Sequence, residues 1–342
     1  MDSENDALLR VEHLTTAFNA GDGVLLRAVD DVAFTIRRGE TVALVGESGC
    51  GKSVTALSIV RLVQPPGRIV SGRVLFEGRD LLALSEREMQ RVRGARIALV
   101  FQEPASALNP VFTIGDQVGE AMLVHGRASR RDVRAKTVDL LDAVRIPDPA
   151  DTARAYPHQL SGGMRQRVLI AMAIACRPDL VIADEPTTAL DVTIQAEILD
   201  LLRDMQARFG MALLLITHDL GVVAEMTSRV LVMYAGRIVE EAPVRTVFTA
   251  PAHPYTQGLL ASVSRRTEGR HLVGIEGAVP DLASLPPGCA FTPRCGKRLA
   301  VCQVEAPARS SLAPDHAVRC HLHQPPATVS GPGAPESGRG TV

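Results

Sequence analysis

A glycine-rich stretch near the beginning of the chain has the residue types and the spacing that bind phosphate. It matches the pattern G-x-x-x-x-G-K-[ST], and it lies between an apolar run at 41–45 and a helical pattern from residue 52. Glycines let backbone N–H groups turn toward phosphate oxygens, and the positive end of the following helix faces them. Lys52 would reach the β- and γ-phosphates, and the Ser53 hydroxyl would bind Mg²⁺. This phosphate loop consists of Gly46, Glu47, Ser48, Gly49, Cys50, Gly51, Lys52 and Ser53.

Two adjacent carboxylates follow a second apolar run. Residues 180–183 are Leu-Val-Ile-Ala, and Asp184 and Glu185 come directly after them. A strand that ends in acidic residues suits the carboxyl edge of a parallel sheet, where phosphate sites form. Asp184 would bind Mg²⁺ directly or through water, and Glu185 would orient and deprotonate the attacking water. By itself the pair is equally explained as a solvated strand end; the phosphate loop favours the catalytic interpretation.

A third stretch, Ser161-Gly162-Gly163, opens the helical pattern at 162–176. Small residues at a helix start leave backbone N–H groups free for an anion. Ser161 alone is explained as an ordinary helix cap. Capping does not account for two successive glycines, so a second anion site is expected here.

Alternating strands and helices are needed to position these motifs. Residues 8–17 and 29–36 alternate in polarity as half-buried strands do, while short apolar runs indicate buried strands. Strands that alternate with helices predict an α/β fold with a mainly parallel sheet. The buried strands are expected at 41–45, 96–101, 180–183 and 211–216, and the helices at roughly 52–63, 115–126, 132–145, 162–176 and 193–208.

Composition narrows the class of protein. The 342 residues are 46% hydrophobic, enough for a sizeable core, and the formal net charge of −1 argues against nucleic acid as the main partner. No run approaches the roughly 20 apolar residues that a membrane helix needs. The acidic N-terminus lacks the features of a signal peptide. We therefore expect a cytosolic protein that reaches a membrane only through partners.

In this order, the phosphate loop, Leu-Ser-Gly-Gly-Met-Arg-Gln-Arg at 160–167 and Asp-Glu-Pro-Thr-Thr-Ala-Leu-Asp at 184–191 resemble the ATPases of ABC transporters. The resemblance covers roughly residues 8–325. It implies an α/β P-loop NTPase fold with a RecA-like core, an antiparallel β subdomain and a helical subdomain. It also implies ATP and Mg²⁺ as ligands, with ATP contacted from Gly46 to Val54 and by Ser161, Gly162 and Gly163.

The resemblance implies four further roles. Gln102 matches the glutamine that contacts Mg²⁺ and the attacking water, and His218 matches the histidine that contacts the γ-phosphate. Asp191 matches the aspartate of a loop that crosses the dimer interface. Phe18 matches the aromatic residue that stacks on adenine, although the insertion at 19–23 weakens this alignment. Taken singly, a histidine such as His218 at a strand end is usually structural, Gln102 would be a surface residue, and Phe18 could be a core residue.

In this family two ATPase subunits pair head to tail. Ser161 and Gly163 would then contact the γ-phosphate held by the other subunit, so one chain contributes half of each site. Phrases such as Phe-Gln-Glu-Pro-Ala-Ser-Ala-Leu-Asn-Pro at 101–110 and His-Pro-Tyr-Thr-Gln-Gly-Leu-Leu at 253–260 resemble the dipeptide and oligopeptide permease subgroup.

That subgroup implies a second, homologous ATPase subunit, two membrane permease subunits and an extracytoplasmic peptide-binding protein. It places the chain peripherally, at the cytoplasmic face of the membrane. Nickel, glutathione or antimicrobial-peptide import remain alternatives. A soluble ABC ATPase that acts on ribosomes or DNA is a different class, but it usually has two ATPase units or a coiled-coil insertion, and this chain shows neither. A non-hydrolysing regulatory subunit is disfavoured by the intact Glu185 and His218.

Four of the six cysteines, Cys289, Cys295, Cys302 and Cys320, lie in the last fifth of the chain. In a reducing cytosol such clustering favours a metal site over disulfides, and four thiolates suit zinc or an iron–sulfur cluster. The spacing lacks the C-x2-C pairs of a zinc ribbon. The subgroup resemblance implies a [4Fe–4S] cluster; zinc and free thiols remain the alternatives.

The chain is expected to divide at composition changes. A nucleotide-binding domain at 1–240 contains the helical subdomain at about 103–178. A proline-containing connector at 241–265 leads to a small, loop-rich C-terminal domain at 266–323 with the four cysteines. Pro, Gly and Ser dominate the tail at 324–342, which we expect to be disordered.

Overall fold

The computed structural model describes residues 7–21, 25–188, 190–267 and 275–324. It contains an eight-stranded sheet and a four-stranded sheet, and the larger one has the order β11-β12-β10-β9-β3-β8-β7-β6. Its parallel half consists of β3 (Thr41–Val45), β6 (Ile97–Val100), β7 (Leu180–Asp184), β8 (Ala212–Thr217) and β9 (Arg229–Tyr234). The expected α/β fold is confirmed.

Both faces of this parallel half are covered, so its strands are nearly continuous apolar runs. Neighbouring residues of one strand belong to different cores: Val181 and Ala183 of β7 pack with the helical region, whereas Leu180 and Ile182 pack with the four-stranded sheet. This alternation is the physical reason why the strand is apolar at every position. Helices α1 (Lys52–Ile59), α8 (Val192–Phe209) and α9 (Leu220–Met226) follow β3, β7 and β8.

The four-stranded sheet has the order β2-β1-β4-β5 and is antiparallel. It is formed by β1 (Ala7–Asn19), β2 (Leu25–Arg37), β4 (Gly67–Phe76) and β5 (Arg79–Asp80), and α2 (Glu86–Val92) follows it. The buried side chains of β2 alternate over 32–36, as the polarity pattern predicts, whereas β1 has consecutive buried residues at 8–9 and 14–17, and its register with β2 shifts at several places. The expected antiparallel β subdomain is therefore present.

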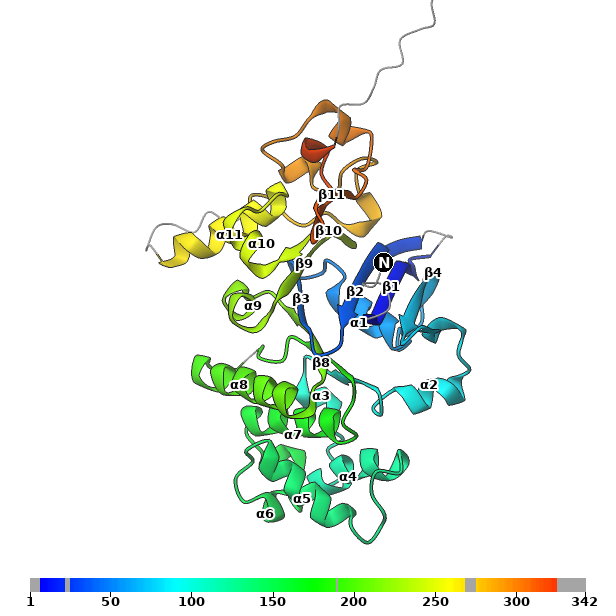
Figure 1. Ribbon diagram of the computed structural model, residues 1–342, viewed down its shortest axis with the longest axis vertical. Helices are drawn as coiled ribbons and strands as arrows, with labels where there is room; N and C mark the ends of the chain where they lie inside the picture. Colours follow the sequence, from blue (N-terminus) through cyan, green and yellow to red (C-terminus); the bar gives the residue numbers. More distant parts are fainter. Residues whose placement is uncertain (1–6, 22–24, 189, 268–274, 325–342) are drawn as a thin grey trace, which may run out of the picture.

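The helical region lies between β6 and β7 in the sequence and forms the end of the molecule farthest from the C-terminal segment (Figure 1). Apolar residues of α4 and α7 pack there with α5 and α8 in one buried cluster. Its helices are α3 (Pro104–Ala107), α4 (Ile114–Val124), α5 (Val133–Ala143), α6 (Pro149–Thr152) and α7 (Gly162–Ile174).

The C-terminal segment is joined to the large sheet by strand pairing. After β10 (Arg237–Pro243), the region expected as a connector forms α10 (Val244–Thr249) and α11 (Pro254–Thr267). The chain then passes through short 3₁₀ turns and returns as β11 (Ser310–Ala313) and β12 (His316–Val318). Strand β12 pairs with β10, so the region after residue 275, here termed the C-terminal unit (275–324), is continuous with the core sheet (Figure 1).

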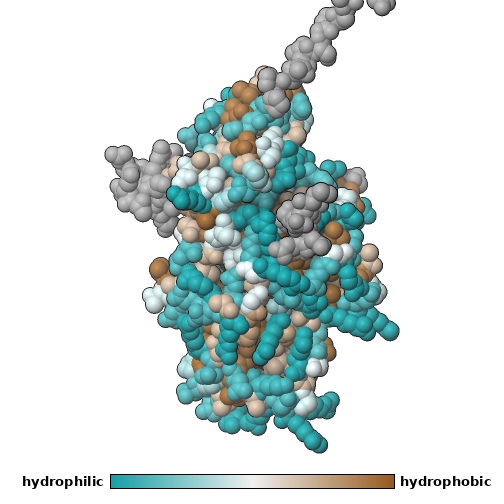
Figure 2. Space-filling view, in the orientation of Figure 1, coloured by the Kyte–Doolittle hydropathy of each residue, from teal (hydrophilic) through white to brown (hydrophobic). Residues whose placement is uncertain are grey.

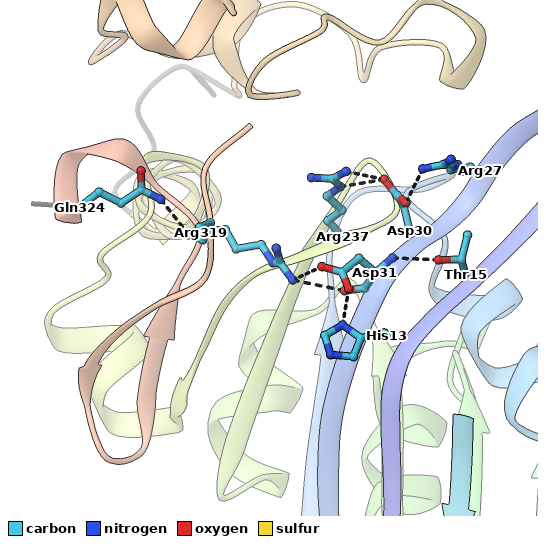
Figure 3. Close-up of polar contacts among 9 residues, drawn as sticks. His13, Thr15, Arg27, Asp30, Asp31, Arg237, Arg319 and Gln324 are labelled. Atoms are coloured by element: carbon cyan, nitrogen blue, oxygen red, sulfur yellow. Dashed lines mark hydrogen bonds and ion pairs between the residues drawn. The ribbon is translucent and has the colours of Figure 1, made fainter. Parts of the chain in front are cut away.

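Ion pairs also attach the C-terminal unit to the antiparallel sheet (Figure 3). Arg319 donates to Asp31 Oδ2 at 2.7 Å, and His13 Nδ1 lies 2.6 Å from Asp31 Oδ1. Burial raises the pKa of Asp31, but the hydrogen bonds from His13 and Arg319 outweigh it and hold that pKa below its usual range. The Asp31 carboxylate therefore stays charged and links β2 to Arg319 of the C-terminal unit.

The surface in the view of Figure 1 is mostly hydrophilic, with hydrophobic side chains in small groups (Figure 2). In the portions of the chain that the structure describes, no helix combines the length and the apolar character required to cross a bilayer.

Candidate functional site

The phosphate loop turns sharply between β3 and α1, and two glycines are required by neighbouring backbone. A Cβ at Gly46 would lie 2.3 Å from the carbonyl oxygen of Met233. A Cβ at Gly51 would lie 2.2 Å from the carbonyl oxygen of Ala28, and Gly51 has a φ of +108°. Only glycine fits such positions, because any side chain would collide with backbone that cannot yield. The loop is therefore seated tightly between β9 and β2.

Two side chains pack the inside of this loop. Lys52 is buried, and its ammonium donates to the carbonyl oxygens of Gly46 at 2.9 Å and Glu47 at 3.0 Å. Cys50 is buried as well, and burial raises the pKa of its thiol. Cys50 thus remains a neutral packing group, which agrees with its interpretation as a small residue inside the motif.

Asp184 has the surroundings of a cation ligand. It ends β7, is buried, and its Oδ1 has no hydrogen-bond partner. Burial is the largest influence and raises the pKa of Asp184, while a hydrogen bond with Ser53 and the charge of Lys52 oppose it. A buried carboxylate oxygen without a partner is costly unless a cation satisfies it. Asp184 and Ser53 therefore fit a hard, oxygen-binding ion such as Mg²⁺.

Glu185 is the centre of a group of polar side chains. Its Oε2 accepts hydrogen bonds from Gln102 Nε2 at 3.0 Å and from Thr188 Oγ1 at 2.8 Å. His218 Nδ1 lies 3.4 Å from Glu185 Oε1. The backbone of Glu185 has a φ of +46°, which is unusual for a non-glycine residue and is found at functional sites. The structure thus brings Glu185 and Gln102, which are expected to act on the attacking water, together with His218, which is expected to contact the γ-phosphate, and adds Thr188.

A cavity of about 650 Å³ connects these groups. Seven of the fourteen residues expected to contact ATP line it, together with Ala28 of β2 and Val279 of the C-terminal unit, which the sequence motifs did not indicate. Its lining consists of Ala28, Glu47, Ser48, Gly49, Gly51, Lys52, Ser53, Val54, Gln102, Glu185, His218 and Val279. One concave site with a lysine, a hydroxyl and carboxylates can bind a triphosphate and place water beside a base.

The anion site expected at the start of α7 lies outside this cavity. Ser161 is exposed and caps α7 by accepting a hydrogen bond from the N–H of Met164 at 3.3 Å. Gly163 faces α8, where a Cβ would lie 2.8 Å from Ile194 Cγ2. Gly162 is exposed beside Leu190. Within one chain these residues do not meet the phosphate loop.

Asp191 and Phe18 also do not line the cavity. Asp191 caps α8, where its Oδ1 accepts from the N–H of Ile194 at 3.0 Å. Phe18 is half-buried on β1 and pairs with Gly67, where a Cβ would lie 2.5 Å from the Phe18 ring. This contact matches the packing alternative for Phe18.

The four late cysteines lie near one another and form no disulfide; Cys302 and Cys320 are buried, and Cys289 and Cys295 are partly exposed. The Cys289 N–H donates to the Cys302 carbonyl oxygen at 2.8 Å. Burial, followed by the neighbouring cysteines, raises the pKa of the Cys320 thiol to about 11. Among the residues that the structure describes, however, no group of three or more His, Cys, Asp or Glu side chains is arranged to hold a metal ion. The thiols are neighbours, but they do not form an assembled metal site.

A parallel sheet, a phosphate loop between a strand and a helix, and carboxylates at the sheet's carboxyl edge define a nucleoside-triphosphate-hydrolysing protein of the P-loop class. Comparison with known families identifies the kind of P-loop protein. Residues 29–188 match the family described as ABC transporter, and residues 239–302 match the oligopeptide/dipeptide transporter C-terminal region.

Two curated relatives extend over almost the whole chain. The probable peptide ABC transporter ATP-binding protein y4tR of Sinorhizobium fredii is 52% identical over 318 residues, which cover 92% of this chain and 95% of that protein. The dipeptide transport ATP-binding protein DppD of Bacillus subtilis is 49% identical over 319 residues, which cover 93% and 95%. The chain therefore belongs to the family of ATP-binding proteins of ABC transporters.

Solved structures support the same fold. The dimeric, post-hydrolysis ATP-binding cassette MJ0796 with ADP and Pi superposes with a TM-score of 0.63 at 28% identity, covering 69% of this chain and 99% of that one. The cbiO1 subunit of Clostridium perfringens gives 0.62 at 28% identity, covering 77% and 99%. The chain has the ABC ATPase fold and is an ATPase, as its motifs predict.

Proposed function

We propose that this chain hydrolyses ATP to power the import of dipeptides or oligopeptides through separate membrane subunits. The observation that carries the proposal is the match of residues 239–302 to the oligopeptide/dipeptide transporter C-terminal region. That region lies outside the segment at 29–188 that matches the ABC transporter family in general, so it bears on the kind of transporter. Relatives named for peptide and dipeptide transport agree with it.

In the proposed reaction Glu185 takes the proton of the attacking water. Gln102 and Thr188, both within hydrogen-bond distance, orient its carboxylate, and His218 is placed to contact the γ-phosphate. Lys52 binds the β- and γ-phosphates, while the loop N–H groups cradle them. Mg²⁺, held by Ser53, Asp184 and Gln102, would neutralise phosphate charge.

Two copies of the nucleotide-binding fold are proposed to complete each site. Ser161, Gly162 and Gly163 are displayed at the start of α7, away from their own chain's cavity, so the ATP that they contact belongs to a partner. Asp191 would lie at the same interface. We propose that the partner is a homologous ATPase subunit. Phe18 is proposed to stack on adenine; within the chain its ring packs against Gly67.

The remaining partners are two membrane permease subunits and an extracytoplasmic peptide-binding protein, with no role for nucleic acid. Exposed apolar side chains beside α3 support docking of a membrane subunit there: Phe101, Val111 and Phe112 are 42%, 71% and 53% exposed. Single exposed apolar residues are ordinary, but three around one short segment suggest a contact surface. The chain would then act peripherally, at the cytoplasmic face of the membrane.

The test is reconstitution of the chain with its membrane subunits and partner ATPase in liposomes. Binding protein loaded with dipeptide or oligopeptide should stimulate ATP hydrolysis and peptide uptake, and Glu185→Gln should abolish both. Stimulation by nickel or glutathione without any response to peptides would contradict the peptide assignment. Full ATPase activity that responds to no membrane subunit would favour a soluble ABC ATPase.

We propose that the chain divides into a nucleotide-binding domain at 1–240, a connector at 241–265 and a C-terminal domain at 266–323, with the helical subdomain at about 103–178.

A [4Fe–4S] cluster is proposed on the four late cysteines, Cys289, Cys295, Cys302 and Cys320. The closeness of the four thiols supports a cluster, while their present arrangement does not assemble one. Anaerobically purified protein should contain about four irons per chain, as the cluster's formula requires. Zinc, or no metal, would contradict the cluster. The tail at 324–342 lies outside the described residues, apart from Gln324.

A further inference from the structure

Two residues from beyond position 250 hold Glu47, the second residue of the phosphate loop. Arg294 of the C-terminal unit donates to Glu47 Oε2 at 2.7 Å and to Oε1 at 3.0 Å, which is a two-pronged ion pair. The hydroxyl of Tyr255, on α11, accepts a hydrogen bond from the Glu47 N–H at 2.9 Å. These contacts connect parts of the chain that are more than 200 residues apart in sequence.

Arg294 is held in place from several sides. Its side chain is only 5% exposed, and it also donates to the carbonyl oxygens of Ile275 at 3.1 Å and Glu276 at 3.0 Å. The hydrogen bond with Glu47 is the largest influence on the pKa of Arg294 and raises it, so the guanidinium remains charged. A planar guanidinium fixed by four acceptors has little freedom to leave the loop.

Tyr255 is fixed by aromatic packing. Its ring centroid lies 4.6 Å from that of Tyr234 on β9 and 5.5 Å from that of Phe291, between Cys289 and Cys295. Tyr255 is fully buried, and burial raises the pKa of its hydroxyl, which therefore stays neutral. Rings packed in this way keep the hydroxyl directed at the loop.

All the hydrogen-bonding groups of Glu47 are therefore engaged. Its N–H meets Tyr255, its carboxylate meets Arg294, and its carbonyl oxygen accepts from Lys52. Because Glu47 lines the cavity, an unpaired carboxylate there would repel the phosphates of ATP. Arg294 neutralises that charge and holds it against the C-terminal unit, and Val279 of the same unit lines the cavity.

We propose that Arg294 and Tyr255 are positioning residues for ATP: the C-terminal unit and α11 hold the phosphate loop in the form that binds the nucleotide. The inference rests on the ATPase site and not on peptide as the cargo. A change in the segment that carries Cys289, Phe291 and Cys295 would reach the ATP site through Arg294. The C-terminal unit then contributes to ATP binding, in addition to being attached to the core sheet.

The test measures binding of a fluorescent ATP analogue to the full-length chain with Mg²⁺. Arg294→Gln should raise Kd roughly tenfold, and Tyr255→Phe roughly threefold, as expected for losing a charged and a neutral hydrogen bond. Arg294→Lys keeps the charge but not the fork, so its Kd should be intermediate. The matched control is Arg309→Gln, which removes another arginine of the C-terminal unit. Arg309 donates to Glu241 Oε2 at 2.8 Å and not to the phosphate loop. The Kd of this variant for the ATP analogue should equal that of the unaltered chain.

A double-mutant cycle separates positioning from general destabilisation. If Arg294 acts through Glu47, then Arg294→Gln should have little further effect on Kd in a Glu47→Gln background. Additive effects of the two changes would overturn the proposal. If Arg294→Gln does not fold, the test uses Tyr255→Phe, which removes only one oxygen atom. An unchanged Kd in folded Tyr255→Phe would also overturn the proposal. Absence of ATP binding in the unaltered chain would instead contradict the ATPase assignment.

Discussion

The side-chain amide of Gln102 donates a hydrogen bond to the Glu185 carboxylate at 3.0 Å, although 83 positions separate the two residues. Gln102 follows β6, Glu185 follows β7, and His218, 3.4 Å from the same carboxylate, follows β8. These strands are adjacent and parallel, so their carboxyl ends bring the three side chains to one edge of the sheet. This convergence is the basis of the first prediction.

Glu185→Gln should lower the ATP turnover rate by at least roughly 100-fold, because it removes the base and keeps the side chain's shape. ATP binding should persist, and the ATP-bound pairing of subunits should become longer-lived. Steady-state phosphate release in the assembled complex measures the first effect. The control is Glu225→Gln, on the exposed surface of α9, where Glu225 pairs with Arg203. Normal turnover in Glu185→Gln would refute the assignment of the base.

Asp184→Asn should raise the Mg²⁺ concentration needed for half-maximal ATPase activity by roughly tenfold or more, because the charged ligand is lost. The buried Oδ1 that lacks a partner is the group expected to bind the ion. A Mg²⁺ titration at fixed ATP measures the effect. An unchanged midpoint would show that Asp184 is not a ligand.

Ser161→Arg should prevent ATP-dependent pairing of subunits, because a long cation would occupy the exposed start of α7. The pairing is measured by light scattering with ATP, in a Glu185→Gln background that traps the bound state. Ser129→Arg is the matched control, since Ser129 is an exposed serine near the start of α5. If both variants pair equally well, the start of α7 does not contact the partner.

Acid should destabilise the protein through His253. Burial lowers the pKa of His253 to about 4, against about 6.5 in an unfolded chain, while nearby Glu240 raises it and His323 lowers it. Between pH 4 and pH 6.5 the unfolded chain therefore binds a proton on His253 that the folded protein does not. The contribution of His253 to the free energy of unfolding is complete above pH 6.5 and is lost as the pH falls toward 4. The loss should approach about 1 kcal/mol per pH unit within this window.

Urea unfolding at pH 7 and pH 5.5 measures this loss. His253 Nδ1 accepts a hydrogen bond from the Tyr255 N–H at 3.0 Å, and protonation would remove that acceptor. His253→Asn keeps an acceptor but does not titrate, so its stability should depend less on pH. Equal pH dependence of the two proteins would exclude His253 as the cause.

The sequence predicted much of the local structure. Strands and helices lie close to the expected positions, and the strand expected at 211–216 is β8 at Ala212–Thr217. Periodicity indicated the helices and the half-buried strands, whereas the buried strands were indicated by short apolar runs bounded by turn residues, because both of their faces are covered. The pairing of β12 with β10 was not visible, since β12 is three residues long and carries too short a pattern.

The phosphate loop, the acidic pair after β7 and the serine–glycine start of α7 could be recognised from the sequence by itself, because each acts through neighbouring residues at fixed spacing. Only the tertiary structure decided which of these groups meet. It placed Glu185 beside Gln102 and His218, left Ser161 outside the cavity, and brought Arg294 to Glu47. Such contacts depend on strand order and on packing between distant segments. No local sequence pattern encodes these contacts, because they form only when distant segments of the chain pack together in the folded structure.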